Sequence, residues 1–443
     1  MSTKPPSGTR DFLPDEIRRR TYVIDKVREV YERYGFEPLE TPAFENIETL
    51  LGKYGEEGNR LIFKILKRGE HESSGGADLA LRYDLTVPLA RVVAEYQDTL
   101  SKSFKRYQIQ PVWRADRPQK GRFREFYQCD IDTVGSTSPV VEAEILDAVC
   151  DVLQELSFTD FTIRLNHRRL LAALLQVAGV AEHAHGDALI AIDKLDKIGE
   201  AGVVKELTEK GIDAATAERV LASFATQGGA AADTLNLVLQ GHESGTAALS
   251  ELRAIVGMTA AAPRIKIDPS LARGLSYYTG AIMEIAVPGL AGSLGGGGRY
   301  DNLVGMFLGR DVPACGFSLG LERIIVVMTE RDMFPAAVAG GAVDVMVTIW
   351  NDEAHVGACR SDALALAAEL RKGGLRVDVY PEADKLGKQF KYASSRNVPC
   401  VAIVGDDERA KGLVAIKDMK SGEQTAHRRD EVAGAVARKL TNG

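Results

Sequence analysis

The spacing of apolar residues along the chain changes several times, and each change predicts a different kind of structure. Residues 14–36, PDEIRRRTYVIDKVREVYERYGF, carry apolar side chains at helical intervals. Acidic residues open this segment and Gly35 closes it, as is usual at the two ends of a helix. The stripe predicted to face the core consists of Ile17, Tyr22, Val23, Val27, Val30 and Tyr31.

Alternating, strand-like segments then dominate as far as residue 132, with a predicted helix at about 87–96. Pro38 and Pro42 favour an extended chain at 36–45, because a proline disfavours helical geometry in the residue before it. DFTIRLNHR, at 160–168, predicts a further strand. The first part of the chain is therefore expected to mix strands and helices.

From about 168 to 262 the sequence is rich in Ala, Leu, Lys and Glu, and it predicts a small helical module inserted within a larger domain. Strand-like patterning resumes at RIKIDPSLARGLSYYTGAIMEIAV. After an Ala- and Gly-rich linker, three predicted strands, VDVMVTIW, LRVDVY and VPCVAIVG, alternate with two predicted helices, which favours a parallel α/β unit. The length of 443 residues also favours division into several domains.

Composition is that of an ordinary globular protein, with 45% apolar and 26% charged residues and a net charge of −7. No apolar run approaches the roughly 18 residues of a membrane span, and the N-terminus lacks a signal or transit pattern, so a cytoplasmic location is expected. The five cysteines are scattered and predict buried thiols, without a disulfide framework or a zinc site. We expect no protein-bound structural metal. An acidic average still allows a local basic strip for nucleic acid.

The segment GRFREFYQCDID, at 121–132, alternates as a strand with an unusual polar face. Arg122, Arg124, Phe126, Gln128, Asp130 and Asp132 would stand in one row on that face. Upstream, Arg114 and Asp116 share a face before the loop RPQKG, so the two segments predict a hairpin. Such a row suits a ligand with phosphates, a flat base and an ammonium group, although a solvated face of an edge hairpin is the alternative.

Three other segments suggest ligand contacts of lower specificity. Arg82, Asp84 and Thr86 are predicted to share a strand face, where an acid and a hydroxyl could accept an ammonium group or simply form a salt-bridged strand end. Of Tyr277 and Tyr278, one is expected in the core and the other to aim its hydroxyl at a ligand. Four glycines at 295–298 allow close backbone approach, yet such a run is more often a hairpin turn and is not a Walker loop.

Together these segments resemble the histidyl-tRNA synthetase family of class II aminoacyl-tRNA synthetases over nearly the whole chain. The resemblance rests on GTRDFLP (8–14), LRYDLTVPLAR (81–91), WRADRPQKGRFREFYQCD (113–130), RGLSYYTG (273–280), GGGGRYDNL (295–303) and GFSLGLER (316–323). The third and last correspond to class motifs two and three, and RGLSYYTG is specific to histidine. Pro42, in ETPAFE, fits motif one, which forms the homodimer in the class.

The resemblance implies a fold and a division into domains. It implies an α+β catalytic domain built on an antiparallel sheet at 1–335, with the helical insertion at about 168–262, and a C-terminal α/β anticodon-binding domain at 343–443. It also implies a ligase that activates L-histidine with ATP and Mg²⁺ and transfers the histidyl group to histidine tRNA.

The resemblance further implies roles for individual residues. ATP would be bound by Arg114, Asp116, Arg122, Phe126, Arg273 and Arg323. Histidine would be bound by Asp84, Thr86, Arg114, Gln128, Asp132, Tyr277 and Tyr278. Arg114 and Arg273 would be catalytic, because they would neutralise charge at the α-phosphate. Asp116 departs from the family, which usually has Glu there.

The tail is expected to bind tRNA through a basic strip at Lys385, Lys388, Lys391 and Arg396, with a plain solvated helix face as the alternative. The tail has 16 basic and 15 acidic residues, so it is less acidic than the rest. Two other functions share the fold. One is a regulatory subunit of ATP phosphoribosyltransferase, and the other is a tRNA-binding sensor with an inactive catalytic site. The regulatory subunit typically lacks the C-terminal anticodon-binding domain and the RGLSYYTG segment, both of which are found in this sequence. Against the inactive sensor, Arg114, Arg273 and Arg323 are all retained.

Overall fold

The computed structural model describes residues 3–67, 76–119, 121–224, 231–272, 277–290, 292–339, 341–352 and 354–442. The chain divides into two compact units, Met1–Met333 and Phe334–Gly443, which are treated separately below. Among the described residues, no helix is both long enough and apolar enough to cross a lipid bilayer. All five cysteines are buried free thiols, which confirms the prediction for them.

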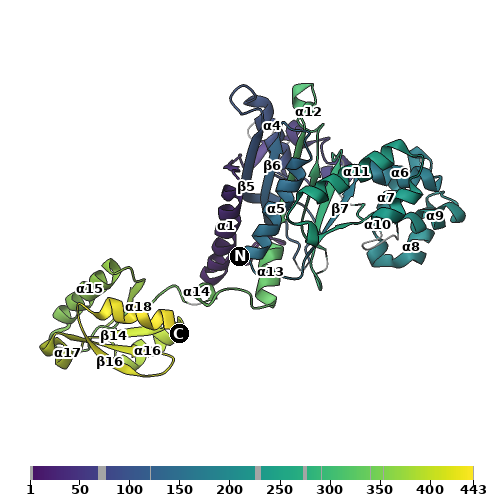
Figure 1. Ribbon diagram of the computed structural model, residues 1–443. Coiled ribbons are helices and arrows are strands. Elements are labelled where there is room, and N and C mark those ends of the chain that lie inside the picture. Colours follow the sequence, from purple (N-terminus) through teal and green to yellow (C-terminus); the bar gives the residue numbers. More distant parts are fainter. Residues whose placement is uncertain are drawn as a thin grey trace. The chain divides into compact units, whose positions relative to one another are not determined.

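An eight-stranded sheet organises the N-terminal unit (Figure 1), in the order β1-β5-β6-β11-β10-β9-β7-β8. Its strands are β1 (Glu37–Pro38), β5 (Phe104–Trp113), β6 (Glu125–Val134), β7 (Thr162–His167), β8 (Ile265–Ile267), β9 (Ala281–Ala286), β10 (Ser293–Arg299) and β11 (Ala314–Gly320). All neighbours pair antiparallel except β1 with β5 and β7 with β8. The predicted α+β class with an antiparallel sheet is confirmed.

Three helices, α1 (Pro14–Arg33), α5 (Val140–Glu155) and α13 (Leu321–Glu330), lie along one face of this sheet. The predicted stripe of α1 is correct for its central part, because Val23, Val27, Val30 and Tyr31 are fully buried. Ile17 is exposed instead, since it lies on the first turns of the helix, beyond the edge of the sheet's core. The short helices and the small sheet described next, together with polar side chains, lie on the other face.

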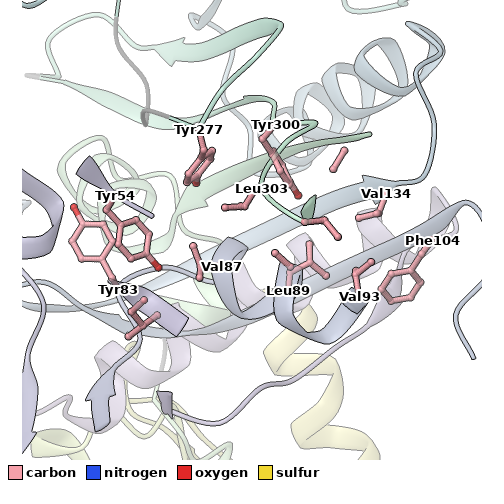
Figure 2. Close-up of a cluster of buried hydrophobic side chains, with 14 of the residues drawn as sticks. Tyr54, Tyr83, Val87, Leu89, Val93, Phe104, Val134, Tyr277, Tyr300 and Leu303 are labelled. Atoms are coloured by element: carbon pink, nitrogen blue, oxygen red, sulfur yellow. The ribbon is translucent and has the colours of Figure 1, made fainter. Parts of the chain in front are cut away.

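A second, three-stranded sheet contains β2 (Phe44–Asn46), β4 (Ala77–Leu81) and β3 (Lys64–Leu66), in that order. The short helices near it are α2 (Ile47–Leu50), α3 (Gly55–Arg60), α4 (Thr86–Glu95) and α12 (Gly305–Leu308). Tyr54, Tyr83, Val87, Tyr277 and Tyr300 belong to one buried cluster on this side (Figure 2). This cluster joins segments that are far apart in the sequence.

The segment between the parallel neighbours β7 and β8 is helical throughout its described residues, apart from turns. It comprises α6 (Arg168–Ala178), η2 (Glu182–Ala184), α7 (His185–Ile192), α8 (Leu195–Glu209), α9 (Ala214–Phe224), α10 (Ala231–Val238), α11 (Glu243–Met258) and η3 (Ala262–Arg264). The helices end where β8 returns to the edge of the sheet beside β7.

The C-terminal unit contains a five-stranded sheet in the order β13-β12-β14-β15-β16. Its elements are α14 (Ala336–Ala339), β12 (Val345–Val347), α15 (Val356–Lys372), β13 (Val377–Val379), α16 (Leu386–Ser395), β14 (Cys400–Ile403), α17 (Asp406–Lys411), β15 (Leu413–Asp418), β16 (Gln424–Arg428) and α18 (Val432–Asn442). The first three strands are parallel as predicted, but β15 and β16 are antiparallel. The sequence analysis identified neither of these last two strands, which are antiparallel because β14 to β16 are joined by short connections without a long crossover helix.

Candidate active site

Strand β6 carries the polar row, but it begins later than the sequence suggested. Pairing with β5 starts at Glu125, so Arg122 and Arg124 precede the strand and lie in the 114–124 loop. Within β6 the alternation holds: Phe126, Gln128, Asp130 and Asp132 share one face, while Tyr127 faces the side of α1 and α13. The predicted six-residue row is therefore a four-residue row with a loop above it.

A buried charge cluster lies at the far end of this row. Asp132 and Asp130 are each 2% exposed, and the fully buried Arg106 reaches across from β5. Arg106 Nη2 lies 2.8 Å from Asp132 Oδ2 and 3.9 Å from Asp130 Oδ2. The Tyr300 hydroxyl donates to Asp132 Oδ1. This arrangement fixes the Asp132 carboxylate from two sides.

The protonation of these carboxyl groups reflects opposing effects. Burial raises the pKa of Asp132, while Arg106 and the Tyr300 hydroxyl oppose that shift. Burial likewise raises the pKa of Asp130, again against Arg106. Gln128 Oε1 accepts no hydrogen bond from any described residue, and Asp132 Oδ2 has only its ion pair with Arg106. Because buried acceptors are normally satisfied, Gln128 Oε1 is available to a polar ligand, and a carboxylate oxygen can accept a further bond beside Arg106.

Glycines keep the space beside this cluster open. Gly316 of β11 lies opposite Asp132, and a Cβ there would stand 1.8 Å from Asp132 Oδ1. On β10, a Cβ at Gly298 would stand 3.0 Å from the Tyr278 ring. The glycine run is thus a central strand and not the hairpin turn that the sequence favoured. Close packing between adjacent strands, and not turn geometry, explains these glycines.

Asp84 is a junction between several segments and not a strand residue. Strand β4 ends at Leu81 and α4 begins at Thr86, so the prediction of one strand face for Arg82, Asp84 and Thr86 was wrong. Asp84 Oδ1 accepts from the Val87 backbone amide at 3.1 Å, which satisfies an orphan donor of the helix. Pro88, within the first turn of α4, is tolerated there for the same reason.

Two phenols complete the environment of Asp84. Tyr54 donates to Oδ1 at 2.9 Å and Tyr277 to Oδ2 at 3.4 Å. Burial raises the pKa of Asp84, and the Val87 amide and Arg114 oppose that shift. Tyr277 is therefore the core tyrosine of the pair, although its hydroxyl is engaged. The ring of Tyr278 packs edge-on against Tyr277 at 5.1 Å between centroids.

Arg114 stands between two rings above the polar row. Its Nε donates to the Tyr83 carbonyl at 3.1 Å, and its Cζ lies 4.3 Å from the centre of the Tyr83 ring and 5.1 Å from that of Phe126. The ring of Tyr83 packs at a tilt against that of Tyr54, with 4.6 Å between ring centres (Figure 2). Among the described residues, Arg114 contacts Tyr83 and Phe126 and has no carboxylate oxygen within 4.0 Å. A guanidinium held in this way can receive an anionic ligand.

Several other predicted ligand residues are engaged within the protein. Arg122 forms a two-pronged ion pair with Asp116, at 3.0 and 2.9 Å. Arg323, in the first turn of α13, donates to the Ser293 carbonyl at 2.5 Å. Gln128 donates to Ser318 at 2.7 Å. Arg273 lies outside the described residues.

The structure thus gathers Asp84, Arg114, Phe126, Gln128, Asp132, Tyr277 and Tyr278 around one face of the sheet. Sequence reasoning missed three residues of this site. Arg106, Tyr54 and Tyr300 each contact a predicted carboxylate from a distant segment. The sequence did contain a signal for Arg106, because it lies within the strand segment KRYQIQ. A central strand seldom buries an unpaired charge, so a charged partner could have been expected.

No group of three or more His, Cys, Asp or Glu side chains suited to a metal ion occurs within the described ranges. A cavity of about 270 Å³ lies between α1 and α13, on the other side of β6 from the polar row. It is therefore distinct from the candidate active site.

Comparisons with known protein families match both units. The family model described as histidyl-tRNA synthetase matches residues 8–324. The model described as anticodon binding domain matches residues 344–439. The two matches together span most of the chain.

Individual relatives agree with these matches. The chain is 42% identical to histidine–tRNA ligase of Christiangramia forsetii, covering 98% of this chain and 100% of the relative, and 43% identical to that of Porphyromonas gingivalis, covering 95% of each. The crystal structure of histidyl-tRNA synthetase from Nostoc superposes with a TM-score of 0.84 at 33% identity, over 99% of this chain and 100% of that one.

A structure from Bacillus halodurans, described as an ATP phosphoribosyltransferase regulatory subunit/histidyl-tRNA synthetase, has a TM-score of 0.73. It is 23% identical and covers 90% of this chain and 98% of that one, so it supports the fold alone. Sequence identity over nearly the full length, and the match of the family model to residues 8–324, establish that this chain belongs to the histidyl-tRNA synthetase family.

Proposed function

We propose that the protein is a histidine–tRNA ligase and that the polar face of β6 is its catalytic surface. One observation carries this proposal: a fixed carboxylate at Asp132 and an accessible guanidinium at Arg114 occupy the same face of one sheet. In the first step the histidine carboxylate attacks the α-phosphorus of ATP, and pyrophosphate leaves. In the second step a terminal ribose hydroxyl of the tRNA attacks the histidyl carbonyl, and AMP leaves.

The residue roles are those that the family resemblance implies, and the chemistry of each group is compatible with them. Arg114 would neutralise charge that develops at the α-phosphate, and Phe126 would stack on the adenine. Asp132 and Tyr278 would hydrogen-bond the two imidazole nitrogens. Asp84, Thr86 and Gln128 would receive the α-ammonium group, with Tyr277 orienting Asp84 through the contact already described.

The remaining predicted nucleotide ligands are Arg122, Arg323, Asp116 and Arg273. Arg122 and Arg323 would bind the outer phosphates after exchanging their present partners. The nucleotide would arrive as its magnesium complex, with the metal held largely by phosphates and water. We retain Arg273 from the sequence resemblance alone.

The domain assignments and the assembly belong to the same proposal. Residues 1–335 would form the catalytic domain, with the helical insertion at 168–262, and residues 343–443 would bind the tRNA. A homodimer is supported by the exposed apolar side chains Phe44, Leu51 and Leu66 near the small sheet, because such groups favour burial against a partner. Sedimentation equilibrium would measure the oligomeric state. The cytoplasmic location stays a prediction from the sequence.

The alternative is a regulatory paralogue that senses histidine without charging tRNA. The match of residues 344–439 to an anticodon-binding domain argues against it, because such paralogues typically lack that domain. Histidine-dependent ATP–pyrophosphate exchange, followed by charging of histidine tRNA, tests the proposal. Histidine binding without either reaction would favour the paralogue.

Substituting Tyr300 by phenylalanine should weaken histidine binding selectively. The change removes the hydroxyl that lowers the pKa of Asp132, so a smaller fraction of Asp132 is ionised near neutral pH. We expect the KM for histidine at pH 7 to rise about tenfold, the usual worth of a hydrogen bond to a charged group, with the KM for ATP unchanged.

Because the raised pKa is the cause, the ratio of variant to wild-type KM should shrink as the pH rises from 7 to 8.5. Protonation of the substrate imidazole affects both proteins equally and cancels in that ratio. A ratio independent of pH would show that Tyr300 acts through geometry and not through the charge of Asp132.

In the structure, only part of the basic strip predicted in the tail is without an acidic partner among the described residues. Lys388 pairs with Asp384 at 2.8 Å, and Arg396 pairs with Asp378. Lys385, at the N-terminal end of α16, and Lys391 within it are exposed and form no ion pair with a described residue. These two lysines are therefore the better candidates for phosphate contacts.

Replacing both Lys385 and Lys391 by alanine should reduce the salt dependence of tRNA binding. Each lost phosphate contact lowers the slope of log K against log salt by about one, so the double variant should lose about two. Lys388→Ala is the matched control, because its charge is already compensated by Asp384. An unchanged slope in the double variant would assign tRNA binding to another surface.

A further inference from the structure

The segment 7–12, SGTRDF, contacts the 114–124 loop from behind, on the side of β6 away from the polar row. The Cζ atom of Arg10 lies 3.5 Å from the centre of the Phe123 ring and 4.8 Å from that of Phe12. Arg20 Cζ lies 4.0 Å from the centre of Phe12 and 4.9 Å from that of Tyr127. Rings and guanidinium groups therefore alternate in one stack from the loop to β6, which we call the Arg10 stack.

Backbone hydrogen bonds join the same two segments. The Arg124 amide donates to the Gly8 carbonyl at 2.8 Å, and Arg124 Nη1 donates to the Ser7 carbonyl at 3.3 Å. Gly8 has a φ of +86°, and a Cβ there would stand 2.7 Å from the Arg124 side chain. The segment is thus shaped to lie directly on Arg124.

Arg124 also contacts residues of the loop that are assigned to the nucleotide. Its carbonyl accepts from the Arg114 amide at 2.9 Å, and its Nε donates to the Asp116 carbonyl at 3.0 Å. Asp116 in turn holds Arg122. Both ends of the loop are therefore fixed through Arg124, which is itself held by Ser7 and Gly8.

The far end of the Arg10 stack is anchored in the fold. Arg20 Nη1 donates to Glu322 of α13 at 2.9 Å, and Glu322 also accepts from the Tyr127 amide at 3.0 Å. The cavity of about 270 Å³ borders Arg10, Phe12 and Arg20. Because one side of the stack opens on this space, these side chains depend on one another for their positions more than on surrounding core.

We propose that residues 7–12 brace the 114–124 loop and that Arg10 is a positioning residue for ATP. This inference rests on the proposed function, because it assigns the loop to the nucleotide. Arg10 acts only through Phe123 and the loop, on the opposite side of β6 from the reacting groups. The brace reduces the number of loop conformations, so that less ordering remains when ATP binds.

The test compares Arg10→Met and Phe123→Leu with wild type. Each change removes a cation–π contact and keeps side-chain bulk. We expect the KM for ATP in pyrophosphate exchange to rise about fivefold to tenfold, within the range that such a contact is worth. The KM for histidine should stay unchanged. Phe123→Tyr, which keeps the aromatic face, should restore the KM for ATP.

Two controls separate this effect from a general loss of stability. Arg28→Met removes an exposed guanidinium of α1 that forms an ion pair with Asp25 of the same helix and contacts Tyr107 of β5, away from the Arg10 stack, and it should change neither KM. The double variant Arg10→Met/Phe123→Leu should be no worse than Arg10→Met alone, because the Arg10–Phe123 contact is already lost in that single variant. Equal increases in both KM values, with a lower melting temperature, would overturn the positioning role.

A second measurement does not depend on catalysis. Trypsin can cleave after Arg122 and Arg124 in the loop, and cleavage there by a protease reports local opening. We expect faster cleavage within 114–124 in both single variants, and wild-type cleavage in Arg28→Met. If the wild type lacks exchange activity, the proposed function fails while cleavage still tests the brace. Unchanged cleavage and unchanged KM for ATP would disprove the brace.

Discussion

Replacing Arg114 by methionine is expected to lower the rate of histidine-dependent ATP–pyrophosphate exchange by about 10²- to 10³-fold, the usual loss when one charge-stabilising donor is removed. Arg114 is held by the Tyr83 carbonyl and lies between the rings of Tyr83 and Phe126. These contacts fix its direction and leave its charge to the ligand. Methionine keeps much of the side-chain length and removes only the cation.

The matched control for this change is Arg117→Met. Arg117 lies in the same loop and is exposed, so its loss should leave exchange near the wild-type rate. The loss in Arg114→Met should appear in kcat and in kcat/KM together, because the interaction strengthens as charge develops. A variant with near-normal kcat and a raised KM for ATP would assign Arg114 to ground-state binding alone.

The pairing of Arg122 with Asp116 affects how the outer phosphates could bind. The Arg122 side chain is 48% exposed, and exposed ion pairs contribute little to stability. A triphosphate carries more charge than one carboxylate, so it can displace Asp116 from Arg122. In the proposed function Asp116, where the class usually has Glu, would then be a temporary partner of the arginine.

The part of the site that could be predicted from the sequence is the part with a local cause. Strand alternation depends on neighbouring residues only, and it placed Phe126, Gln128 and Asp132 on one face correctly. The predicted start of β6 was wrong because the Arg124 backbone amide donates a hydrogen bond to the Gly8 carbonyl, more than 110 positions away in the chain. A hydrogen bond between distant segments does not change the local spacing of apolar residues, so the sequence pattern could not reveal it.

Residues that support the carboxylates were missed for a related reason. Arg106 meets Asp132 only through the register of β5 against β6, and Tyr300 meets it only because β10 and β11 bring a distant loop close. Asp84 looked like a strand residue, since Pro88 two positions after Thr86 suggested an extended chain. The same sequence is also compatible with a helix that has the proline in its first turn, and this is what the structure shows for α4.

Selectivity for histidine should collapse in Asp132→Asn. The amide keeps the shape of the side chain, but it presents an NH₂ group either to the imidazole N–H or to Arg106. A buried polar contact of this kind discriminates by about 10⁴-fold when it is left unpaired. We therefore expect the KM for histidine to rise by at least about 10²-fold, with the KM for ATP nearly unchanged, measured by pyrophosphate exchange.

Asp130→Asn provides an unusually close control for that prediction. Asp130 lies two positions earlier on the same face, is equally buried, and shares Arg106 with Asp132, at 3.9 Å instead of 2.8 Å. Loss of a carboxylate beside Arg106 is therefore common to both variants, whereas the predicted imidazole contact, the hydrogen bond from Tyr300 and the closer ion pair belong to Asp132 alone. If histidine binding falls equally in the two variants, the charge balance of Arg106 determines affinity and Asp132 has no direct role. A large loss confined to Asp132→Asn would identify it as the residue that reads the imidazole.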